Sequence, residues 1–213
     1  MPAIAKNNDL ITVIIIFVVE PEQQQKLIDT IIEFIDNAVK YQPGFVSASL
    51  HKSLDGIRVM NYAQWQSLEE YYTFLDNSEV QAQGKKLANF NPPDLHIFEV
   101  VVSQPENAPL EINRGDLIHL AEFRVKPENQ QRLVELEKEY VGVALQNPGL
   151  ISANFHRSLD GTRIMNYGQW RSWEDFELLL QDPKYKPLSE YWQGLAENEV
   201  HLYEVVFTKS TTN

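Results

Sequence analysis

The strongest constraint on this chain is a segment that occurs twice. It reads HKSLDGIRVMNYAQWQS at residues 51–67 and HRSLDGTRIMNYGQWRS at residues 156–172, at an offset of 105 residues. The match extends at this offset from Pro-Gly at 43–44 to Glu-Val-Val at 99–101, and it continues upstream with a one-residue slip. A repeat of this length predicts two copies of one domain of about a hundred residues. We expect the first domain at residues 1–103, a polar, proline-containing linker at 104–115, and the second domain at 116–213.

Composition and charge exclude several classes of protein. The formal net charge is −12 at pH 7, whereas a nucleic-acid partner requires a basic surface. The chain has no cysteine, so disulfides, thiolate metal sites and cysteine nucleophiles are excluded. The longest apolar run, residues 10–19, is too short to span a bilayer, and no basic segment precedes it as in a signal peptide. We therefore expect a cytoplasmic protein with neither a nucleic-acid nor a membrane partner.

Each copy predicts the same order of secondary structure. A first strand precedes a helix, a two-stranded hairpin, a second helix and a closing strand (95–102 and 201–207). The first strand is apolar at 10–19, whereas its counterpart at 117–125 carries His119, Glu122 and Arg124. A further short helical segment at 78–88 should be broken in the second copy by Pro183 and Pro187, and residues 208–213 should form a tail. The order β-α-β-β-α-β is the ferredoxin-like arrangement of an α+β protein. Because the free face of each sheet is too apolar to face water, we expect the sheets to pack together as a barrel within one chain, with the helices outside.

The hairpin decides which side chains lie under the helices. A three-residue loop at 54–56, with Gly56 in the left-handed region, would pair Ser53 with Ile57. Since side chains alternate along a strand, this register places one set on the helix-covered face, namely Ser47, Ser49, His51, Asn61 and Trp65, and in the second copy Ser152, Asn154, His156, Asn166 and Trp170. A two-residue loop would instead turn His51 to the opposite face.

Small and polar side chains on a buried face predict a ligand pocket. An ordinary core would be apolar there, and buried polar groups without partners are costly. A cavity with a few hydrogen-bonding groups explains the composition. The alternative is that these groups bond to one another or to water.

The histidines and arginines of the repeat are expected to have different roles. His51 and His156 are candidate general bases because histidine titrates near neutrality. His96 and His201 are expected to serve packing of the fold. Arg58 and Arg163 are expected to form salt bridges between the sheets, with Glu99 or Glu204 as partners.

Both copies resemble the antibiotic biosynthesis monooxygenase family of the dimeric α+β barrel superfamily. The resemblance rests on Pro-Gly before the hairpin, the Ser-Leu-Asp-Gly turn, the Asn-Tyr-x-Gln-Trp motif and Glu-Val-Val in the last strand. It implies that the chain is the family's dimer fused into one polypeptide, which could associate further into homo-oligomers. In cofactor-free members that oxidise aromatic polyketides, the asparagine and tryptophan hydrogen-bond the substrate and stabilise its deprotonated, oxygenated form. These roles would fall on Asn61 and Trp65, and on Asn166 and Trp170.

The resemblance also separates the two copies. A pocket histidine of some members matches His51 and His156, and a tyrosine matches Tyr71 but meets Phe176 in the second copy. If one site works, we expect it to be the first. The histidine and first-strand asparagine that haem-degrading members need have no counterpart here.

Three functions remain open at this point. The first is a cofactor-independent monooxygenase that oxidises an aromatic or quinol-like small molecule with O₂, without metal or cofactor; Asn61, Trp65 and His51 would act on the substrate, and Ser47, Ser49, Tyr71, Ser152 and Asn154 would bind it. The second is a binding protein that uses the same pocket without turnover. The third is a non-redox enzyme such as an isomerase, because one fold hosts unlike activities.

Overall fold

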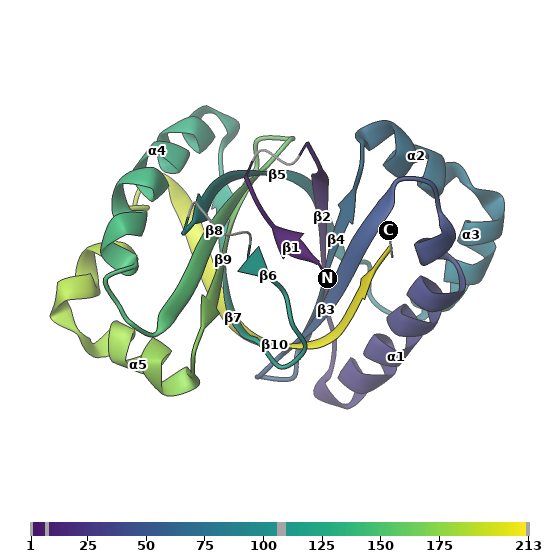
Figure 1. The fold of residues 1–213 in the computed structure, drawn as a ribbon, viewed down its shortest axis with the longest axis horizontal. Coiled ribbons are helices and arrows are strands. Elements are labelled where there is room, and N and C mark those ends of the chain that lie inside the picture. Colours follow the sequence, from purple (N-terminus) through teal and green to yellow (C-terminus); the bar gives the residue numbers. More distant parts are fainter. Residues whose placement is uncertain (1, 7–8, 106–109, 212–213) are drawn as a thin grey trace.

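Strands of both copies close into one eight-stranded barrel (Figure 1). The computed structural model describes residues 2–6, 9–105 and 110–211. The strands of the first copy are β2 (Ile11–Val18), β3 (Phe45–Ser53), β4 (Arg58–Trp65) and β5 (Asp94–Gln104), and those of the second are β7 (Leu117–Val125), β8 (Leu150–Ser158), β9 (Arg163–Trp170) and β10 (Ala196–Ser210). Their order around the barrel is β10-β3-β4-β2-β5-β8-β9-β7. The two sheets are therefore joined at their edges as well as face to face, and the predicted intrachain α+β barrel of ferredoxin-like units is confirmed.

The closing strand of each copy bridges to the other copy. β5 pairs with β2 of its own copy and with β8 of the second, and β10 pairs likewise with β7 and β3. The prediction that residues 208–213 form a tail is wrong for the part that the structure describes as strand. Thr208, Lys209 and Ser210 continue β10 and pair with Ser49, Ala48 and Ser47, because the strand finds free backbone groups on β3. Residues 212–213 lie outside the described residues.

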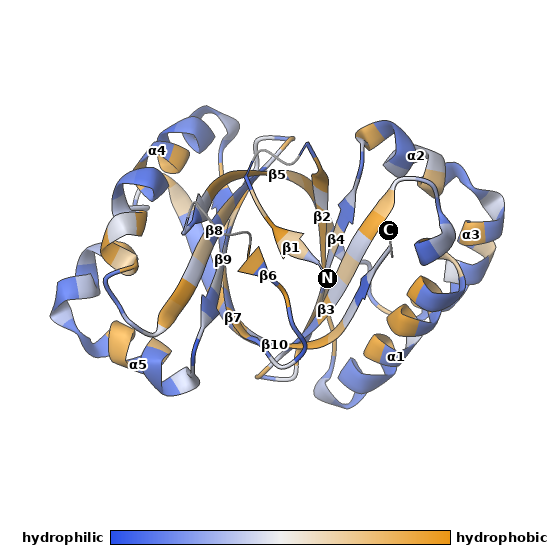
Figure 2. Ribbon diagram, in the orientation of Figure 1, coloured by the Kyte–Doolittle hydropathy of each residue, from blue (hydrophilic) through white to orange (hydrophobic). Residues whose placement is uncertain are grey.

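The helices cover the outside of the barrel (Figure 1). They are α1 (Pro21–Asn37), α2 (Leu68–Asp76), α3 (Ser78–Gly84), α4 (Pro127–Ala144) and α5 (Trp173–Gln181), with 3₁₀ turns η1 (Val39–Tyr41), η2 (Lys85–Asn89) and η3 (Pro183–Ser189). Pro21 opens α1, where its missing N–H costs nothing, and the apolar side of the helix turns to the sheet (Figure 2). Ser67 caps α2 by accepting from the Glu70 N–H. Proline at 183 and 187 leaves only 3₁₀ structure in η3, as expected.

Two short strands close part of the barrel interior. β1 (Ala3–Ile4) pairs with β6 (Leu110–Glu111), which lies in the segment expected to be the linker. Ile4 and Ile112 are fully buried and join the apolar cluster inside the barrel. The connection between the copies thus contributes side chains to the core in addition to joining the two domains. Residues 106–109 within it lie outside the described residues.

The predicted register of the hairpin is wrong by one residue. Phe45 pairs with Trp65 as expected, but a bulge at Val46 follows, and Ser49 then pairs with Tyr62 and His51 with Met60. The loop accordingly spans four residues, 54–57, with Gly56 at φ 82° in the left-handed region as predicted. The second copy repeats the bulge at Ile151. One extra residue moves every following side chain of β3 and β8 to the other face of the sheet.

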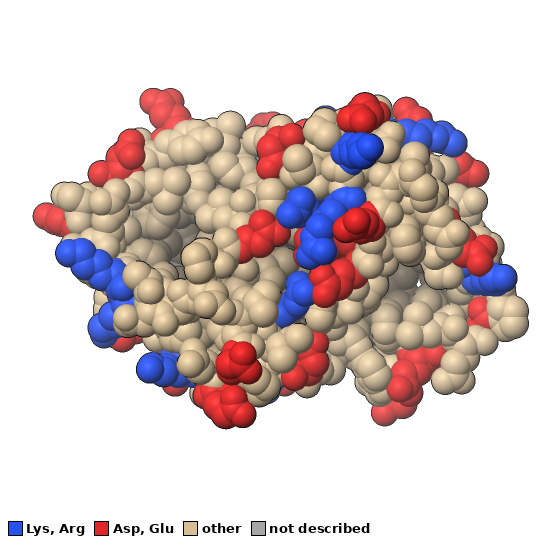
Figure 3. All heavy atoms as spheres, turned by 180° about the vertical axis from the view of Figure 1, so that it is seen from behind, with Lys and Arg blue, Asp and Glu red and all other residues tan. Residues whose placement is uncertain are grey.

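The contacts between the copies are symmetric and charged. His96 bonds Asp160 in the second hairpin loop at 2.7 Å, and His201 bonds Asp55 in the first at 2.8 Å. Arg58 and Arg163 form salt bridges between the copies, as expected, but Arg58 pairs with Glu199 and Glu122, and Arg163 with Asp94, rather than with Glu99 or Glu204. Arg163 also pairs with Glu122 within the second copy. Charged side chains gather along the middle of the molecule in Figure 3, between the two halves.

Candidate active site

A cavity of about 340 Å³ lies between the first sheet and its helices. Strands β2 and β4 form its floor, α1 and α2 its walls, and α3 and η2 its outer side. Exposed residues at its edge, Leu75, Gln81, Lys85 and Leu95, mark the mouth. The surface of the molecule is hollowed over each half (Figure 3). Most of the lining is aliphatic or aromatic, which suits an apolar ring system.

Asn61 and Trp65 bring polar atoms to this apolar cavity. Both lie on β4, four residues apart, so they share the helix-facing side of the sheet. The Asn61 Oδ1 is buried without a hydrogen-bond partner. Within the described residues, neither the Asn61 Nδ2 nor the Trp65 Nε1 has an acceptor. Polar groups left unpaired in an apolar cavity are available to a ligand.

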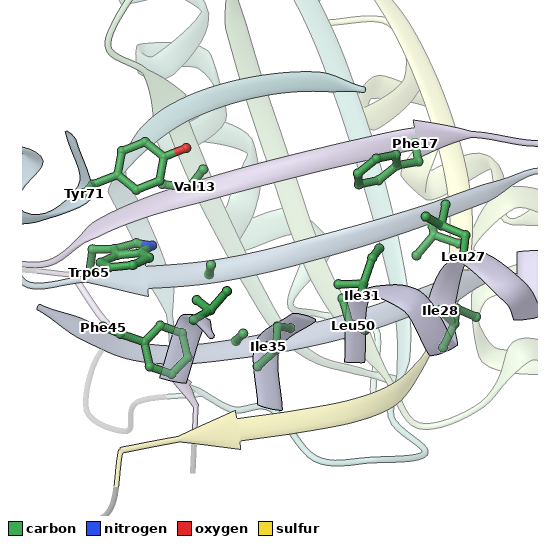
Figure 4. Close-up of a cluster of buried hydrophobic side chains, with 14 of the residues drawn as sticks. Val13, Phe17, Leu27, Ile28, Ile31, Ile35, Phe45, Leu50, Trp65 and Tyr71 are labelled. Atoms are coloured by element: carbon green, nitrogen blue, oxygen red, sulfur yellow. The ribbon is translucent and has the colours of Figure 1, made fainter. Parts of the chain in front are cut away.

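Aromatic side chains hold Trp65 in place. Phe45 packs edge-on at 5.6 Å between ring centroids, and Tyr71 of α2 lies at 5.5 Å. Figure 4 shows these three side chains at one end of the buried cluster, with Val13 beside them and the side chains of α1 further along. Burial raises the pKa of Tyr71 to about 12, so its hydroxyl keeps its proton at neutral pH.

His51 and the serines of β3 do not share this cavity, so their predicted grouping with Asn61 is wrong. The bulge turns Ser47, Ser49 and His51 into the barrel. His51 Nε2 bonds the Tyr167 hydroxyl at 2.9 Å, and Ser47 donates to Gln64 at 2.8 Å. Burial lowers the pKa of His51 to about 4, so the imidazole is neutral.

The second copy repeats this correction. His156 Nε2 bonds the Tyr62 hydroxyl at 3.0 Å, the counterpart of the His51 contact, and burial lowers its pKa to about 4. Ser103 donates to the Asn154 Oδ1 at 2.7 Å, and the Asn154 Nδ2 donates to Ser152 at 3.2 Å. Most of these groups satisfy one another inside the barrel, which was the alternative to a pocket lined by them.

A smaller cavity of about 190 Å³ occupies the equivalent place in the second copy. Asn166 lines it, and its Oδ1 is buried without a hydrogen-bond partner, like that of Asn61. Trp170 differs from Trp65, because its Nε1 donates to the His119 Nδ1 at 2.6 Å. Phe176 stacks on the same imidazole at 5.7 Å and 25°.

His119 and Gly168 form a matched pair that the first copy lacks. His119 lies opposite Gly168, whereas Val13 lies opposite Ala63 at the same place. A Cβ on residue 168 would sit 2.0 Å from the His119 Cε1, so the imidazole occupies the space of a side chain there. Burial lowers the pKa of His119 to about 4. The sequence does show that 117–125 carries polar residues absent from 10–19, but not that His119 would contact the repeat tryptophan.

Glu137 is a second buried difference. It is 1% exposed on α4, at the place of Ile31 on α1, and its Oε1 accepts from the Tyr191 hydroxyl at 2.7 Å. Burial raises the pKa of Glu137 to about 8. Tyr191 lines the second cavity, so the carboxyl fixes one of its walls. Among residues 2–6, 9–105 and 110–211, no group of three or more His, Asp or Glu side chains is arranged to hold a metal ion.

Comparison with known proteins agrees with this geometry. The family model described as antibiotic biosynthesis monooxygenase matches residues 10–85 and again residues 117–190. The chain belongs to this family. Both matched segments include the repeat motif with its asparagine and tryptophan, so the tandem duplication is a duplication of the family's domain.

Individual relatives place the chain within the family. Over 71 residues it is 41% identical to a tetracenomycin-F1 monooxygenase of Streptomyces glaucescens, a match covering 33% of this chain and 63% of that protein. The chain therefore spans less than two thirds of this relative's length.

Solved structures of the same fold cover nearly the whole chain. The crystal structure of an anthrone oxidase-like protein matches 98% of this chain and 96% of its own with a TM-score of 0.87 at 23% identity. A monooxygenase-related protein of Fusobacterium nucleatum matches 95% and 94% with a TM-score of 0.68 at 10% identity. Both structures share the fold of this chain over nearly its whole length. None of the helices in the described part of the chain is both long and apolar enough to cross a membrane.

Proposed function

We propose that this protein is a cofactor-independent monooxygenase that oxidises an electron-rich hydroxyaromatic compound with O₂ in the first cavity. The observation that supports the proposal most is the pair formed by Asn61 and Trp65, whose polar atoms face an apolar cavity of about 340 Å³ without protein partners. The relative named tetracenomycin-F1 monooxygenase and the anthrone oxidase-like structure point to the same class of substrate.

The reaction balances without a cofactor when the substrate supplies the electrons. An anthrone loses a proton from its CH₂ group to give a resonance-stabilised anion. The anion transfers one electron to O₂, the two radicals combine into a carbon–oxygen bond, and a proton completes the hydroperoxide. Loss of water from the hydroperoxide leaves a carbonyl, so one oxygen atom enters the product and the other leaves as water.

Asn61 and Trp65 would stabilise the anion. The Asn61 Nδ2 and the Trp65 Nε1 are donors on one face of β4, and donors fixed in a dry site stabilise charge that develops on a substrate oxygen. Tyr71 would add a neutral hydroxyl, because its raised pKa of about 12 keeps it protonated. Its ring also packs against the indole and limits the movement of Trp65.

The proton would leave to water rather than to histidine. Tyr71 and Lys85 are the titratable side chains among the described residues that line the cavity. His51, the base that the sequence suggests, lies in the barrel and is bonded to Tyr167. Water at the mouth beside Leu75 and Lys85 is the acceptor that this arrangement leaves.

Oxygen consumption tests the proposal. Purified, metal-stripped protein would be mixed with a panel of anthrones and hydroquinones, beside the variant carrying Asn61→Ala and Asn166→Ala. Uptake above autoxidation that is lost in the variant supports the proposal. Uptake that persists in the variant contradicts the assignment of the reaction to these cavities.

A second function, binding without turnover, is favoured by the absence of a carboxylate or histidine among the described lining residues. Under this function the same compounds would bind the first cavity, and Asn61→Ala would weaken binding. Equilibrium dialysis without O₂ measures binding alone. Compounds that bind in the dialysis but cause no oxygen uptake in the assay above support the function of a binding protein.

A further inference from the structure

The two cavities differ in the donor that each offers. In the first copy the indole N–H of Trp65 has no acceptor among the residues that the structure describes, whereas in the second the N–H of Trp170 donates to the His119 Nδ1 at 2.6 Å. Nδ1 must be unprotonated to accept this bond, so the proton of the neutral imidazole sits on Nε2. Within the described residues, the His119 Nε2 has no hydrogen-bond partner, and His119 lines the cavity.

Trp170 also prevents His119 from acting as a base. For Nε2 to accept a proton from a ligand, the ring would have to become an imidazolium or shift its proton to Nδ1. In the shifted form, an N–H on His119 Nδ1 would point at the Nε1–H of Trp170, although the two nitrogens are only 2.6 Å apart. The imidazolium is disfavoured because the side chain is only 8% exposed and burial lowers its pKa to about 4. His119 is therefore fixed as a donor.

The surrounding residues form a built site around this donor. The imidazole fits because residue 168 is glycine, and Phe176 stacks on it at 5.7 Å. Aromatic and aliphatic side chains make up most of the rest of the lining, and its further polar side chains are Asn166, Lys186, Ser189 and Asn198. An apolar cavity of about 150 Å³ accepts benzene, so about 190 Å³ suits one aromatic ring with a small substituent.

We propose that the second cavity is a separate binding site for a neutral one-ring aromatic carbonyl compound, such as an aryl ketone or a quinone, whose oxygen accepts a hydrogen bond from the His119 Nε2–H. The donor His119 is locked and cannot act as a base, and Lys186, which also lines the cavity, is paired with Glu190 at 3.4 Å. The site therefore binds this ligand without deprotonating it. The first cavity is larger and keeps the free indole. The proposal rests on the proposed function only in taking the first cavity as the oxygenation site; binding at the second is measured without turnover.

Acetophenone and ethylbenzene are suitable probes, because they have similar size but only acetophenone has an acceptor. The indole N–H resonances of the protein report each cavity separately, since Trp192 lines the second and Trp65 the first. The test variant is His119→Val with Gly168→Ala, the pair that the first copy carries at this place. An unchanged Trp65 resonance shows that the variant is folded.

We expect acetophenone to shift the Trp192 resonance, and the double variant to weaken its affinity about fivefold while ethylbenzene affinity does not fall. If the affinities for both probes changed equally, the effect would come from the volume of the cavity alone, and the proposal would be overturned. Absence of a Trp192 shift with millimolar acetophenone would overturn it as well. Imidazole ¹⁵N shifts give an independent measurement: a proton on Nε2 of His119 is expected, and a proton on Nδ1 contradicts the locked donor. Because neither probe consumes O₂, a failed oxygen-uptake assay leaves these results intact.

Discussion

The same motif forms two cavities with different chemistry. Asn-Tyr-x-Gln-Trp places an asparagine and a tryptophan at equivalent positions of β4 and β9. In the first copy neither side chain has a hydrogen-bond partner within the described residues, whereas in the second copy Trp170 is bonded to His119. The second cavity is also smaller, about 190 Å³ against about 340 Å³. The difference comes from His119 on β7 and from Gly168, the variable position of the motif, which leaves room for the imidazole. A motif therefore positions its own side chains, but its neighbours decide which atoms a ligand can reach.

The largest expected effect concerns Glu137, which replaces Ile31 on the equivalent helix. Its pKa is raised from 4.5 to about 8. The folded protein holds a proton that the unfolded chain releases over this range, so stability should fall as pH rises, by at most about 1.4 kcal/mol per pH unit. Glu137→Gln keeps an oxygen for Tyr191 and should remove this slope. Urea unfolding at several pH values between 5 and 8, the range between the two pKa values, measures this slope.

The difference in slope between the variant and the wild type is the quantity to compare. His51, His119 and His156 have pKa values lowered from 6.5 to about 4, so they add stability that is lost as pH falls through that range. The variant retains this opposing slope. Parallel curves for the two proteins would show that Glu137 titrates normally in the folded state. The reciprocal change Ile31→Glu, without a tyrosine partner, should introduce a falling slope into the first half.

The next effect separates the two asparagines. If the first cavity is the oxygenation site, Asn61→Ala should lower kcat/KM for oxygen uptake about 100-fold, because it removes a donor to the anion. Asn166→Ala should lower it less than about threefold, since the second cavity would not contribute turnover. Steady-state oxygen electrode measurements on both variants decide this. Equal losses would mean that the two cavities share the reaction.

Making the first cavity resemble the second should reduce activity more moderately. Val13→His with Ala63→Gly installs the pair that His119 and Gly168 form, so the new imidazole should take the Trp65 N–H. We expect kcat/KM to fall about tenfold, in line with one lost hydrogen bond and some lost volume. Ala63→Gly alone is the control for the added space. If the control loses as much kcat/KM as the double variant, the indole N–H of Trp65 is not needed for the reaction.

The smallest expected effect concerns the hydroxyl that only the first copy has. Tyr71→Phe reproduces the side chain found at Phe176, and we expect about a threefold fall in kcat/KM from the loss of one neutral hydrogen bond. Tyr72→Phe, at an exposed neighbour, is the matched control. If kcat of the wild type changed with pH near neutrality and kcat of Tyr71→Phe did not, the Tyr71 hydroxyl would be titrating there. That result would contradict its raised pKa.

The architecture and four of the cavity residues, namely Asn61, Trp65, Tyr71 and Asn166, could be predicted from the sequence and its family resemblance. The offset of 105 residues predicts the duplication, and apolar periodicity predicts the strands and helices closely, since these patterns are local. Residues 117–125 were predicted as a strand and form β7 with the same limits. Asn61 and Trp65 lie under the helices as predicted, because β4 alternates without interruption.

Which groups face each other depends on how the strands pair in the folded protein. The bulge at Val46 has no distinct sequence signal, yet it moves His51 from the cavity into the barrel, where Tyr167 of the other copy bonds it. His119 and Gly168 are 49 residues apart in the chain and become neighbours only when β7 pairs with β9. Register and strand pairing depend on the sum of many distant contacts, and the chemistry of each cavity follows from them rather than from the motif.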